Sequence, residues 1–374
     1  MQDKVWLNDS TLVNYRIGFV IDWTLGHVTH AQNLAGWLRD DLSVQPTWMQ
    51  VPSHADDIWQ KLPGYTMRAS LRARDQVRAA LGKDALDCLF YHTQVTALFS
   101  LGIMQRVPTV ISLDATPINF QTIAAAYGSK AASGVIDRFK FEWSRRTFQS
   151  AAALVTWSNW AKESLVRDYG VASDKVTVIF PGVDLCQWCP SVREVRKGDP
   201  FRLLFVGGDF ERKGGHILLE AFRSGLADRC TLDIVTKEET VHSGGSVRVH
   251  RGLTPNSPLL RQLFADADLF VFPTLGDCTP IAIMEAMASG LPVLATNVGA
   301  LAEEVEDGVT GLLVPTNDPG AIVEAVRSLA NNPERLAAMG VAGRVQAERL
   351  FNGEHNYKAV IDVLKQCVDE RRTR

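Results

Sequence analysis

The chain has 374 residues, of which 46% are hydrophobic and 22% charged, and its formal net charge at pH 7 is -3. This composition is typical of a soluble globular protein, excludes a disordered or fibrous chain, and argues against bulk electrostatic binding to nucleic acid. The length predicts two domains. The apolar runs are shorter than the ~18 residues of a membrane span, and the first ten residues lack a secretory signal, so we expect a cytoplasmic protein.

Six cysteines are scattered along the chain, and only Cys186 and Cys189 have a C-x-x-C spacing. A zinc site would need a second pair, and a thioredoxin-like site would need a helix opening at this place. We therefore expect reduced cysteines and no metal site.

The first half of the chain alternates apolar runs with amphipathic helical patterns. Six runs are expected to form strands: Arg16–Ile21, Thr47–Val51, Leu86–His92, Thr109–Asp114, Ala153–Ser158 and Val176–Phe180. Several are continuously hydrophobic, which indicates parallel strands with helices covering both faces of the sheet. A helical pattern over residues 159–170 ends at Gly170, a residue that commonly terminates helices.

Residues 186–200 are polar and irregular and are expected to be a linker. Helical patterns from about Asp318 to Arg372 are interrupted near Asn332 and Asn352. The sequence thus predicts an α/β protein with two Rossmann-like parallel-sheet domains (residues 1–190 and 198–350) facing across a cleft, and a terminal helix (351–374) packing back on the first domain. In the second domain, strands are expected at Arg202–Val206, Thr231–Val235, Val247–Arg251, Leu269–Phe272, Pro292–Ala295 and Gly311–Val314.

The loop after Leu269–Phe272 carries the clearest chemical pattern. Thr279 is predicted to cap a helix, Pro280 suits its first position, and Gly290 ends it. The free N–H groups and dipole of such a helix favour a phosphate. Asp277 stands just before the helix, and Glu285 lies within an otherwise apolar body, where a lone carboxylate needs partners such as ribose hydroxyls. Local patterns leave an alternative open: Asp277 as a capping acid and Glu285 paired with a distant cation.

The stretch GDCTPIAIMEAMASGLPVLATNVGALAEEVEDGVTGLLVP (276–315) resembles the signature of retaining GT-B glycosyltransferases of family 4, the group 1 glycosyl transferases. That signature has two acids separated by seven residues, here Asp277 and Glu285. The family's usual first acid is Glu, so Asp277 is a shortened version. The resemblance implies that the first acid and the backbone of the turn hold the transferred sugar and the second acid holds the nucleotide ribose. It places these further residues at the donor: Leu253, Cys278, Thr279, Pro280 and Ile281.

The segment FRLLFVGGDFERKGGHILLEAF (201–222) resembles the first strand, loop and helix of the same family's donor domain. The family's lysine before a glycine matches Lys213 and implies a cation on the donor diphosphate, where charge develops as the phosphate leaves. The family often has an Arg where this chain has Gly208, and Arg212 is the candidate for a second cation. A solvated basic turn is the alternative.

Three polar residues of the first half lie at the carboxyl ends of expected strands or just after them. Gly26 and His27 lie between the first strand and its helix, where the family has a glycine-rich loop near the diphosphate and acceptor. The resemblance implies that His92 lies at the reaction centre, and a structural histidine is the alternative. Many relatives have a histidine before the acid at Asp114, whereas this chain has Leu113. We expect Asp114 and His27 to contact the acceptor, although His27 could instead cap the helix.

Two basic stretches, residues 67–78 and 137–148, have helical patterns, and aromatic residues interleave with cations in the second. Such patterns occur on helices that lie on anionic lipid and also on solvated helix faces. Contact with the inner face of a membrane, and a lipid-linked acceptor, therefore stay open.

Taken together, these patterns predict a hexosyltransferase-type enzyme that moves a sugar from a nucleotide-diphosphate donor to a saccharide, lipid-linked or small-molecule acceptor. The resemblance implies retention of configuration, no metal and no cofactor. A glycosidase also uses two carboxylates but needs no phosphate site. An epimerase, a phosphorylase and a catalytically silent binding subunit on the same fold stay open. The lack of a G-x-G-x-x-G motif after any expected strand argues against a dinucleotide dehydrogenase.

Overall fold

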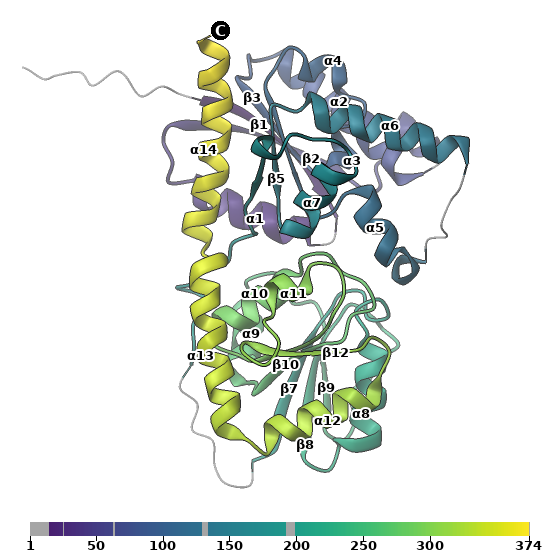
Figure 1. Ribbon diagram of the computed structural model, residues 1–374, viewed down its shortest axis with the longest axis vertical. Helices are drawn as coiled ribbons and strands as arrows, with labels where there is room; N and C mark the ends of the chain where they lie inside the picture. The colour runs from purple at the N-terminus through teal and green to yellow at the C-terminus, as the bar shows by residue number, and fades with distance from the viewer. Residues whose placement is uncertain (1–14, 25, 63, 129–133, 192–198, 374) are drawn as a thin grey trace, which may run out of the picture.

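The computed structural model describes residues 15–24, 26–62, 64–128, 134–191 and 199–373. Two domains stand end to end, each built on a six-stranded sheet in which every paired strand is parallel (Figure 1). The predicted two-domain α/β architecture is confirmed. Each of the twelve expected strands is present, and their ends differ from the prediction by at most a few residues.

The first sheet has the order β2-β1-β3-β4-β5-β6. Its strands are β1 (Tyr15–Trp23), β2 (Val44–Pro52), β3 (Cys88–His92), β4 (Thr109–Leu113), β5 (Ala153–Thr156) and β6 (Val176–Val178). The intervening helices are α1 (His27–Leu38), α2 (Tyr65–Leu81), α3 (Gln94–Ala97), α4 (Leu101–Met104), α5 (Pro117–Ile123), α6 (Val135–Ser150) and α7 (Asn159–Arg167), with short 3₁₀ turns η1 (Ile58–Lys61), η2 (Ala124–Tyr127) and η3 (Ser173–Lys175).

The register of this sheet brings three polar residues to one edge, two of which, His92 and Asp114, were predicted. His92 pairs with Ile21 on one side and with Ser112 on the other. Asp22 and Asp114 therefore lie one or two residues beyond that row, at the carboxyl ends of β1 and β4. In an open parallel sheet this edge is where ligands bind.

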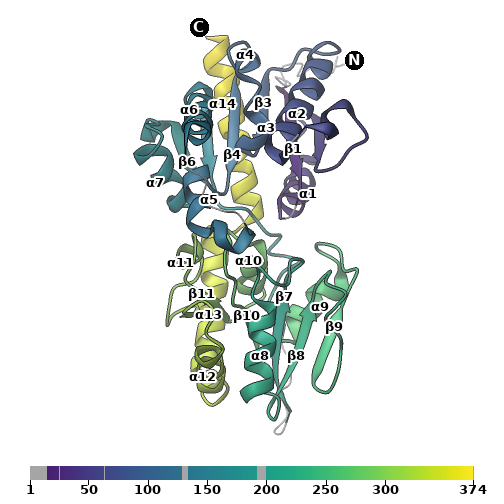
Figure 2. The same cartoon turned by 90° about the vertical axis from the view of Figure 1, so that its right-hand side faces the viewer.

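The second sheet has the order β12-β11-β10-β7-β8-β9. Its strands are β7 (Phe201–Val206), β8 (Cys230–Val235), β9 (Val247–His250), β10 (Leu269–Phe272), β11 (Val293–Thr296) and β12 (Gly311–Val314). The helices around it are α8 (Gly215–Gly225), α9 (Pro258–Asp266), α10 (Ile281–Ala288), α11 (Leu301–Glu304) and α12 (Pro319–Ala330). Figure 2 shows α10 and α11 at the end of this domain that meets the first one.

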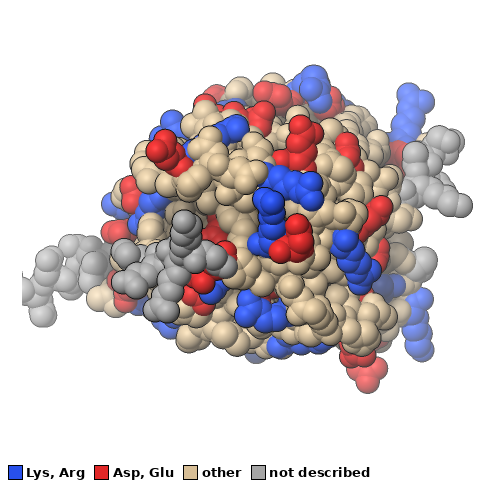
Figure 3. Space-filling view, turned by 90° about the horizontal axis from the view of Figure 1, so that it is seen from below, with Lys and Arg blue, Asp and Glu red and all other residues tan. Residues whose placement is uncertain are grey.

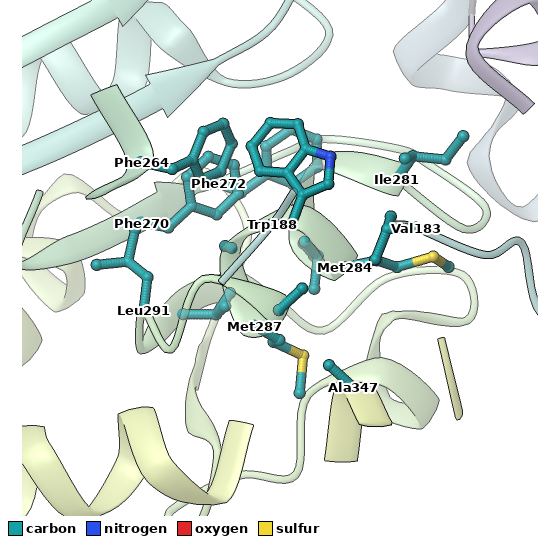
Figure 4. Packing of buried hydrophobic residues seen from close by; sticks show 14 of the residues in the cluster. Val183, Trp188, Phe264, Phe270, Phe272, Ile281, Met284, Met287, Leu291 and Ala347 are labelled. Carbon is teal, nitrogen blue, oxygen red and sulfur yellow. The ribbon is translucent and has the colours of Figure 1, made fainter. Parts of the chain in front are cut away.

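Helix α10 is buried almost all round, which explains its apolar body. Met284 and Met287 pack with aromatic side chains of β10 and with Trp188 in one cluster (Figure 4). Seven of its eight residues are buried, Glu285 included. A helix enclosed in this way is a rigid support for the turn that precedes it.

The domain boundary predicted from the sequence differs from the boundary that the packing of the cores shows. Val183 and Trp188 are almost fully buried in the core of the second domain, although they precede the predicted boundary at residue 190. The central part of the expected linker, residues 192–198, lies outside the described residues. Short apolar anchors inside a polar stretch leave no periodic signal, so the sequence pattern does not reveal them.

The chain ends with two long helices, α13 (Pro333–Leu350) and α14 (Gly353–Arg372), capped by Asn332 and Asn352. α14 leaves the second domain and lies along the first, as the yellow helix in Figure 1 shows. Its inner face joins the core that contains β1 and β3, and the hydroxyl of Tyr357 donates to the carbonyl of Gly182 at 2.9 Å. The final helix thus connects both domains.

Charges of both signs are mixed on two parts of the surface. The end of the molecule farthest from the first domain intersperses Lys and Arg with Asp and Glu (Figure 3). On α6, Arg145 and Arg146 both pair with Glu142, while Phe139 is largely exposed. None of the helices in the described ranges combines the length and apolar composition needed to cross a bilayer. Contact with anionic lipid stays a prediction.

Candidate functional site between the domains

The predicted donor turn, residues 274–280, joins β10 to α10 at the junction of the domains. Its capping differs from the prediction. Pro280, with φ -76° and ψ 116°, is the residue before the helix, and the buried Thr279 hydroxyl has no hydrogen-bond partner among the described residues. Thr279 as N-cap and Pro280 as first helical residue are therefore wrong by one position, because Pro280 adopts an extended ψ. The helix ends as predicted, with Gly290 at a left-handed φ of +70°.

The turn is held from behind by the loop that follows β11. Gly299 has a φ of +58°, and a Cβ there would lie 2.1 Å from the carbonyl oxygen of Asp277, so only glycine fits. The next amide, of Ala300, donates to the carbonyl of Cys278 at 3.3 Å. This close backbone contact fixes the direction in which the Asp277 side chain leaves the turn.

Asp277 is paired with two cations of the β7–α8 loop. Lys213 Nζ and Arg212 Nη1 both lie 3.3 Å from Asp277 Oδ2. Burial raises the pKa of Asp277, but the charges of Lys213 and Arg212 outweigh it and hold that pKa below its ordinary value. Asp277 is therefore a carboxylate, and the predicted acid and cations do meet at one point.

Arg212 and Lys213 play different parts in this group. The Arg212 side chain is 5% exposed, and its Nε donates to Asp209 while Nη1 donates to the carbonyl of Gly276. Its guanidinium also lies 4.5 Å from the ring centre of Tyr127, in the first domain. The Lys213 side chain is 19% exposed and lies over the ring of Phe272. Arg212 thus makes its contacts within the protein, and Lys213 is the cation that keeps an exposed face for a ligand.

Glu285 is buried beside this group. The residue is 5% exposed, and no hydrogen bond or ion pair joins its carboxylate to the described part of the chain. Burial raises its pKa to about 8, and the nearby charge of Lys213 opposes that shift. A buried carboxyl without partners is costly unless a ligand supplies donors. No salt bridge of Glu285 is formed within the described ranges, and the only cation whose charge acts on its pKa there is Lys213.

On the first domain, His27 lies between two carboxylates. Its Nε2 is 3.7 Å from Asp114 Oδ2, and its Nδ1 is 4.0 Å from Asp22 Oδ2. Burial lowers the pKa of His27, but the hydrogen bond and charge of Asp114 and the charge of Asp22 raise it overall. His27 is the first residue of α1, so it does not act as the cap. The structure therefore brings His27 and Asp114 together, as the acceptor prediction requires.

His92 differs from its predicted place in the open cleft. Its ring is fully buried, stacked on His30 at 4.6 Å between ring centres and on Trp157 at 5.2 Å. Burial lowers its pKa well below the ordinary value, and the neighbouring histidines add to this. His27 covers it edge-on at 4.8 Å. The neutral imidazole lies beneath His27 in this conformation, so the expected contact of His92 with a ligand stays a prediction.

Two predicted glycines have no steric reason to be glycine. A Cβ at Gly26 would meet nothing of the described chain within 4 Å, and one at Gly208 would meet only the flexible side chain of Lys237 there. The tight position is Gly207, where a Cβ would lie 2.7 Å from the Phe205 ring. Leu253, predicted to lie at the donor, is half-buried against the second-domain core. The turn residues Cys278, Thr279 and Ile281 are buried, so any contact with a donor there is made by backbone groups and small exposed edges.

The two halves of the site touch at Cys278. This side chain clusters with Ala115 and Ile123 of the first domain. Burial raises the pKa of its thiol well above the ordinary value, and the charges of Asp114 and Asp277 raise it further. The candidate acceptor carboxylate therefore faces the donor turn. Within the described ranges, no group of three or more His, Cys, Asp or Glu side chains is arranged to hold a metal ion.

Two residues of this site were not predicted. Asp22 ends the apolar run of β1 and accepts hydrogen bonds from Thr24 and Tyr65. A carboxylate at the end of a buried strand was a usable signal, whereas Asp114 was indicated by the family resemblance. Tyr127 covers Arg212 from the other domain, and no local pattern in the sequence reports a contact of that kind.

The fold and the site together define a protein of the GT-B class. Sucrose-phosphate synthase from Thermosynechococcus elongatus superposes with a TM-score of 0.76 and 17% identity, over 94% of this chain and 99% of that one. HepE from Anabaena, solved in complex with UDP and glucose, superposes with a TM-score of 0.70 and 15% identity, over 94% of this chain and 100% of that one. At these identities the likeness concerns the fold alone.

Sequence comparison identifies the family. A model described as Glycosyltransferase Family 4 matches residues 26–187, and one described as Glycosyl transferases group 1 matches residues 200–332. Together they cover most of the chain, which belongs to the group 1 glycosyltransferases of family 4. A D-inositol 3-phosphate glycosyltransferase from Paenarthrobacter aurescens is 29% identical over 56% of this chain, and one from Catenulispora acidiphila is 31% identical over 60%. The matches span 57% and 60% of those relatives' lengths.

Proposed function

We propose that the protein transfers a glycosyl group, of hexose type, from a nucleoside-diphosphate sugar to a hydroxyl group of an acceptor. The observation that carries this proposal is the pairing of Lys213 with Asp277 at the mouth of a buried turn, beside Glu285, which has no partner among the described residues. A cation with an exposed face, a fixed carboxylate and an unpartnered buried carboxyl are the groups that a diphosphate, a sugar and a ribose require.

The donor lies, in this proposal, along the edge of the second sheet. Lys213 stabilises the negative charge that develops on the leaving diphosphate. Asp277 accepts hydrogen bonds from the transferred sugar, and Glu285 accepts them from the vicinal ribose hydroxyls. Support comes from HepE, whose crystal structures contain UDP, UDP-glucose, or UDP and glucose, and which has the same fold. UDP-glucose is therefore the first donor to test.

The reaction proceeds with retention in this proposal. The bond between the anomeric carbon and the phosphate oxygen breaks, and the acceptor oxygen bonds to the anomeric carbon on the same face. The acceptor's proton passes to the departing phosphate oxygen, so no protein base is needed. The contribution of the protein is positioning and charge stabilisation, with Lys213 supplying the positive charge beside the leaving diphosphate.

The acceptor lies against the first domain, where Asp114 accepts the hydrogen bond of the reacting hydroxyl and His27 holds Asp114. Asp114 is partly exposed and faces Cys278 in the donor turn. The names of the relatives make a polyol phosphate the first acceptor class to test, followed by saccharides and lipid-linked sugars.

The test is donor turnover with and without these acceptors. Acceptor-dependent release of nucleoside diphosphate, with a product of unchanged anomeric configuration, supports the proposal. Release without any acceptor indicates a slow hydrolase, and interconversion of the donor indicates an epimerase. Donor binding without turnover in the presence of every acceptor indicates a silent binding subunit and contradicts the proposed activity.

A further inference from the structure

A single carboxylate of the second domain accepts three hydrogen bonds from the first. Glu303 Oε2 lies 2.7 Å from the backbone nitrogen of Asn159 and 3.0 Å from its Nδ2. Glu303 Oε1 lies 2.7 Å from the backbone nitrogen of Trp160. These are short, charge-assisted bonds between parts of the chain separated by more than 140 residues.

The donors are amides that α7 cannot satisfy by itself. The first four N–H groups of a helix have no partner within it, and they carry the positive end of its dipole. Ser158, the N-cap, accepts from the amide of Ala161. The amides of Asn159 and Trp160, the first two helical residues, are capped instead by Glu303 from the other domain.

Glu303 is joined rigidly to the donor turn. It lies in α11, four residues after Gly299, whose backbone is in close contact with Asp277. Ala300, at the start of α11, binds the carbonyl of Cys278. Figures 1 and 2 both place α11 on the side of the second domain that faces α7. Any movement of Glu303 therefore also moves the turn that carries Asp277.

The helix at the other end of these bonds is joined equally closely to the acceptor side. The carbonyl of Trp160 accepts a hydrogen bond from Asn119, and its ring packs at the cluster of Ala115 and Cys278. Ala115 follows Asp114 directly in the sequence. The Glu303 contact thus connects the element beside Asp114 with the element beside Asp277.

We propose that Glu303 is a positioning residue that clasps the two domains in the closed arrangement in which Asp114 faces the donor turn. The proposal rests on the proposed glycosyl transfer. In this proposal the clasp releases when a donor enters and re-forms before transfer, so Glu303 acts on the fraction of closed enzyme. It touches neither substrate.

The position of Asn159 allows a selective test. Proline is well tolerated at the first position of a helix, and the preceding Ser158 is already in the extended conformation that a following proline favours. Asn159→Pro therefore removes two of the three hydrogen bonds and leaves α7 intact. Glu303→Ala removes all three hydrogen bonds, and Glu303→Gln keeps an acceptor oxygen but removes the charge. The control is Glu306→Ala, which changes an exposed acid nearby.

The readouts are steady-state kinetics, donor affinity and the radius of gyration from small-angle X-ray scattering. We expect Glu303→Ala and Asn159→Pro to lower kcat by about 10-fold or more, with donor Kd changed far less, because charge-assisted bonds are lost only from the closed state. Glu303→Gln should fall between Glu303→Ala and the wild type. Both clasp variants should have a larger radius of gyration than Glu306→Ala.

The double variant Glu303→Ala/Asn159→Pro should be no worse than Glu303→Ala alone, because both changes remove the same contact. Unchanged scattering in Glu303→Ala, or additive effects in the double variant, would overturn the clasp. The scattering measurement does not depend on turnover. If the wild type fails to transfer any sugar while the clasp variants still open the molecule, the proposed function fails and the clasp stands.

Discussion

Lys213 Nζ lies 3.3 Å from Asp277 Oδ2, so the cation proposed to bind a phosphate also holds the carboxylate proposed to bind a sugar. One ion pair therefore sets the positions of both groups. Because the charges of Lys213 and Arg212 lower the pKa of Asp277, its side chain is a carboxylate at neutral pH. A donor diphosphate approaching Lys213 would meet a lysine already oriented by Asp277, which reduces the cost of ordering this long side chain.

The first prediction concerns this lysine. Lys213→Ala should lower kcat/KM by about 10- to 100-fold, the equivalent of a lost charge-assisted interaction. Lys213→Arg should retain part of the activity, since it keeps the charge but not the shape. Lys358→Ala, at an exposed site on α14, is the matched control. Wild-type kinetics in Lys213→Ala would remove this residue from the donor site.

The second prediction is a pH dependence of donor binding. The pKa of Glu285 is raised to about 8 by burial, so without a ligand the group is mostly protonated at pH 7. Ribose hydroxyls donate to a carboxylate, so the donor should prefer the ionised form and release a proton on binding. The affinity for UDP-glucose, measured by calorimetry, should rise between about pH 6.5 and 8, by at most about 10-fold per pH unit. Glu285→Gln should bind weakly with no such rise; a flat profile in the wild type would contradict the assignment.

The third prediction concerns stability at Glu304. This side chain is fully buried, both carboxylate oxygens lack partners within the described chain, and burial followed by the charges of Asp277 and Glu303 raises its pKa well above the ordinary value. An acid whose pKa is higher in the folded protein than in the unfolded chain destabilises the fold progressively as the pH rises above its pKa in the unfolded chain, about 4.3. Glu304→Gln should therefore raise the melting temperature at about pH 8 more than at about pH 5. Glu306→Gln, on the exposed side of the same segment, should show no such difference.

The fourth prediction concerns the carboxylates beside His27 that raise its pKa. Burial lowers its pKa, but Asp114 and Asp22 raise it overall, so the imidazole is charged at a higher pH than usual. Asp22→Asn should lower the pKa of His27, measured from its imidazole resonances by NMR titration. A histidine with a raised pKa stabilises the fold at low pH, and this stabilisation is lost as the histidine releases its proton. The variant should therefore be less stable than the wild type mainly below about pH 6.5. An unchanged titration would mean that Asp22 does not act on His27.

The strands and the donor turn are predictable because their signals are local. A parallel strand covered on both faces has a continuous apolar run, so β10 is evident from its residues alone. Glu285 stands out because an isolated acid on an apolar helix has a cost that demands a partner. The one-residue error at Thr279 arises because the ψ of Pro280 is set by the turn and not by residue type.

The errors on the first domain have a different origin. Whether His92 is open to a ligand depends on His30 and Trp157, which reach it from two other elements. Tyr127 and Glu303 make their contacts across the domains, and a contact of this kind requires no periodicity or motif in the chain. These positions are defined only by the way the two sheets face each other.

The central claim is that Lys213 and Glu285 together bind a nucleoside-diphosphate sugar between the domains. The most direct test is isothermal titration calorimetry of UDP-glucose and UDP against the wild type, Lys213→Ala and Glu285→Gln. We expect one-to-one binding of at least one of these ligands by the wild type, weakened about 10-fold or more in each variant. Equal affinities in all three proteins would contradict it.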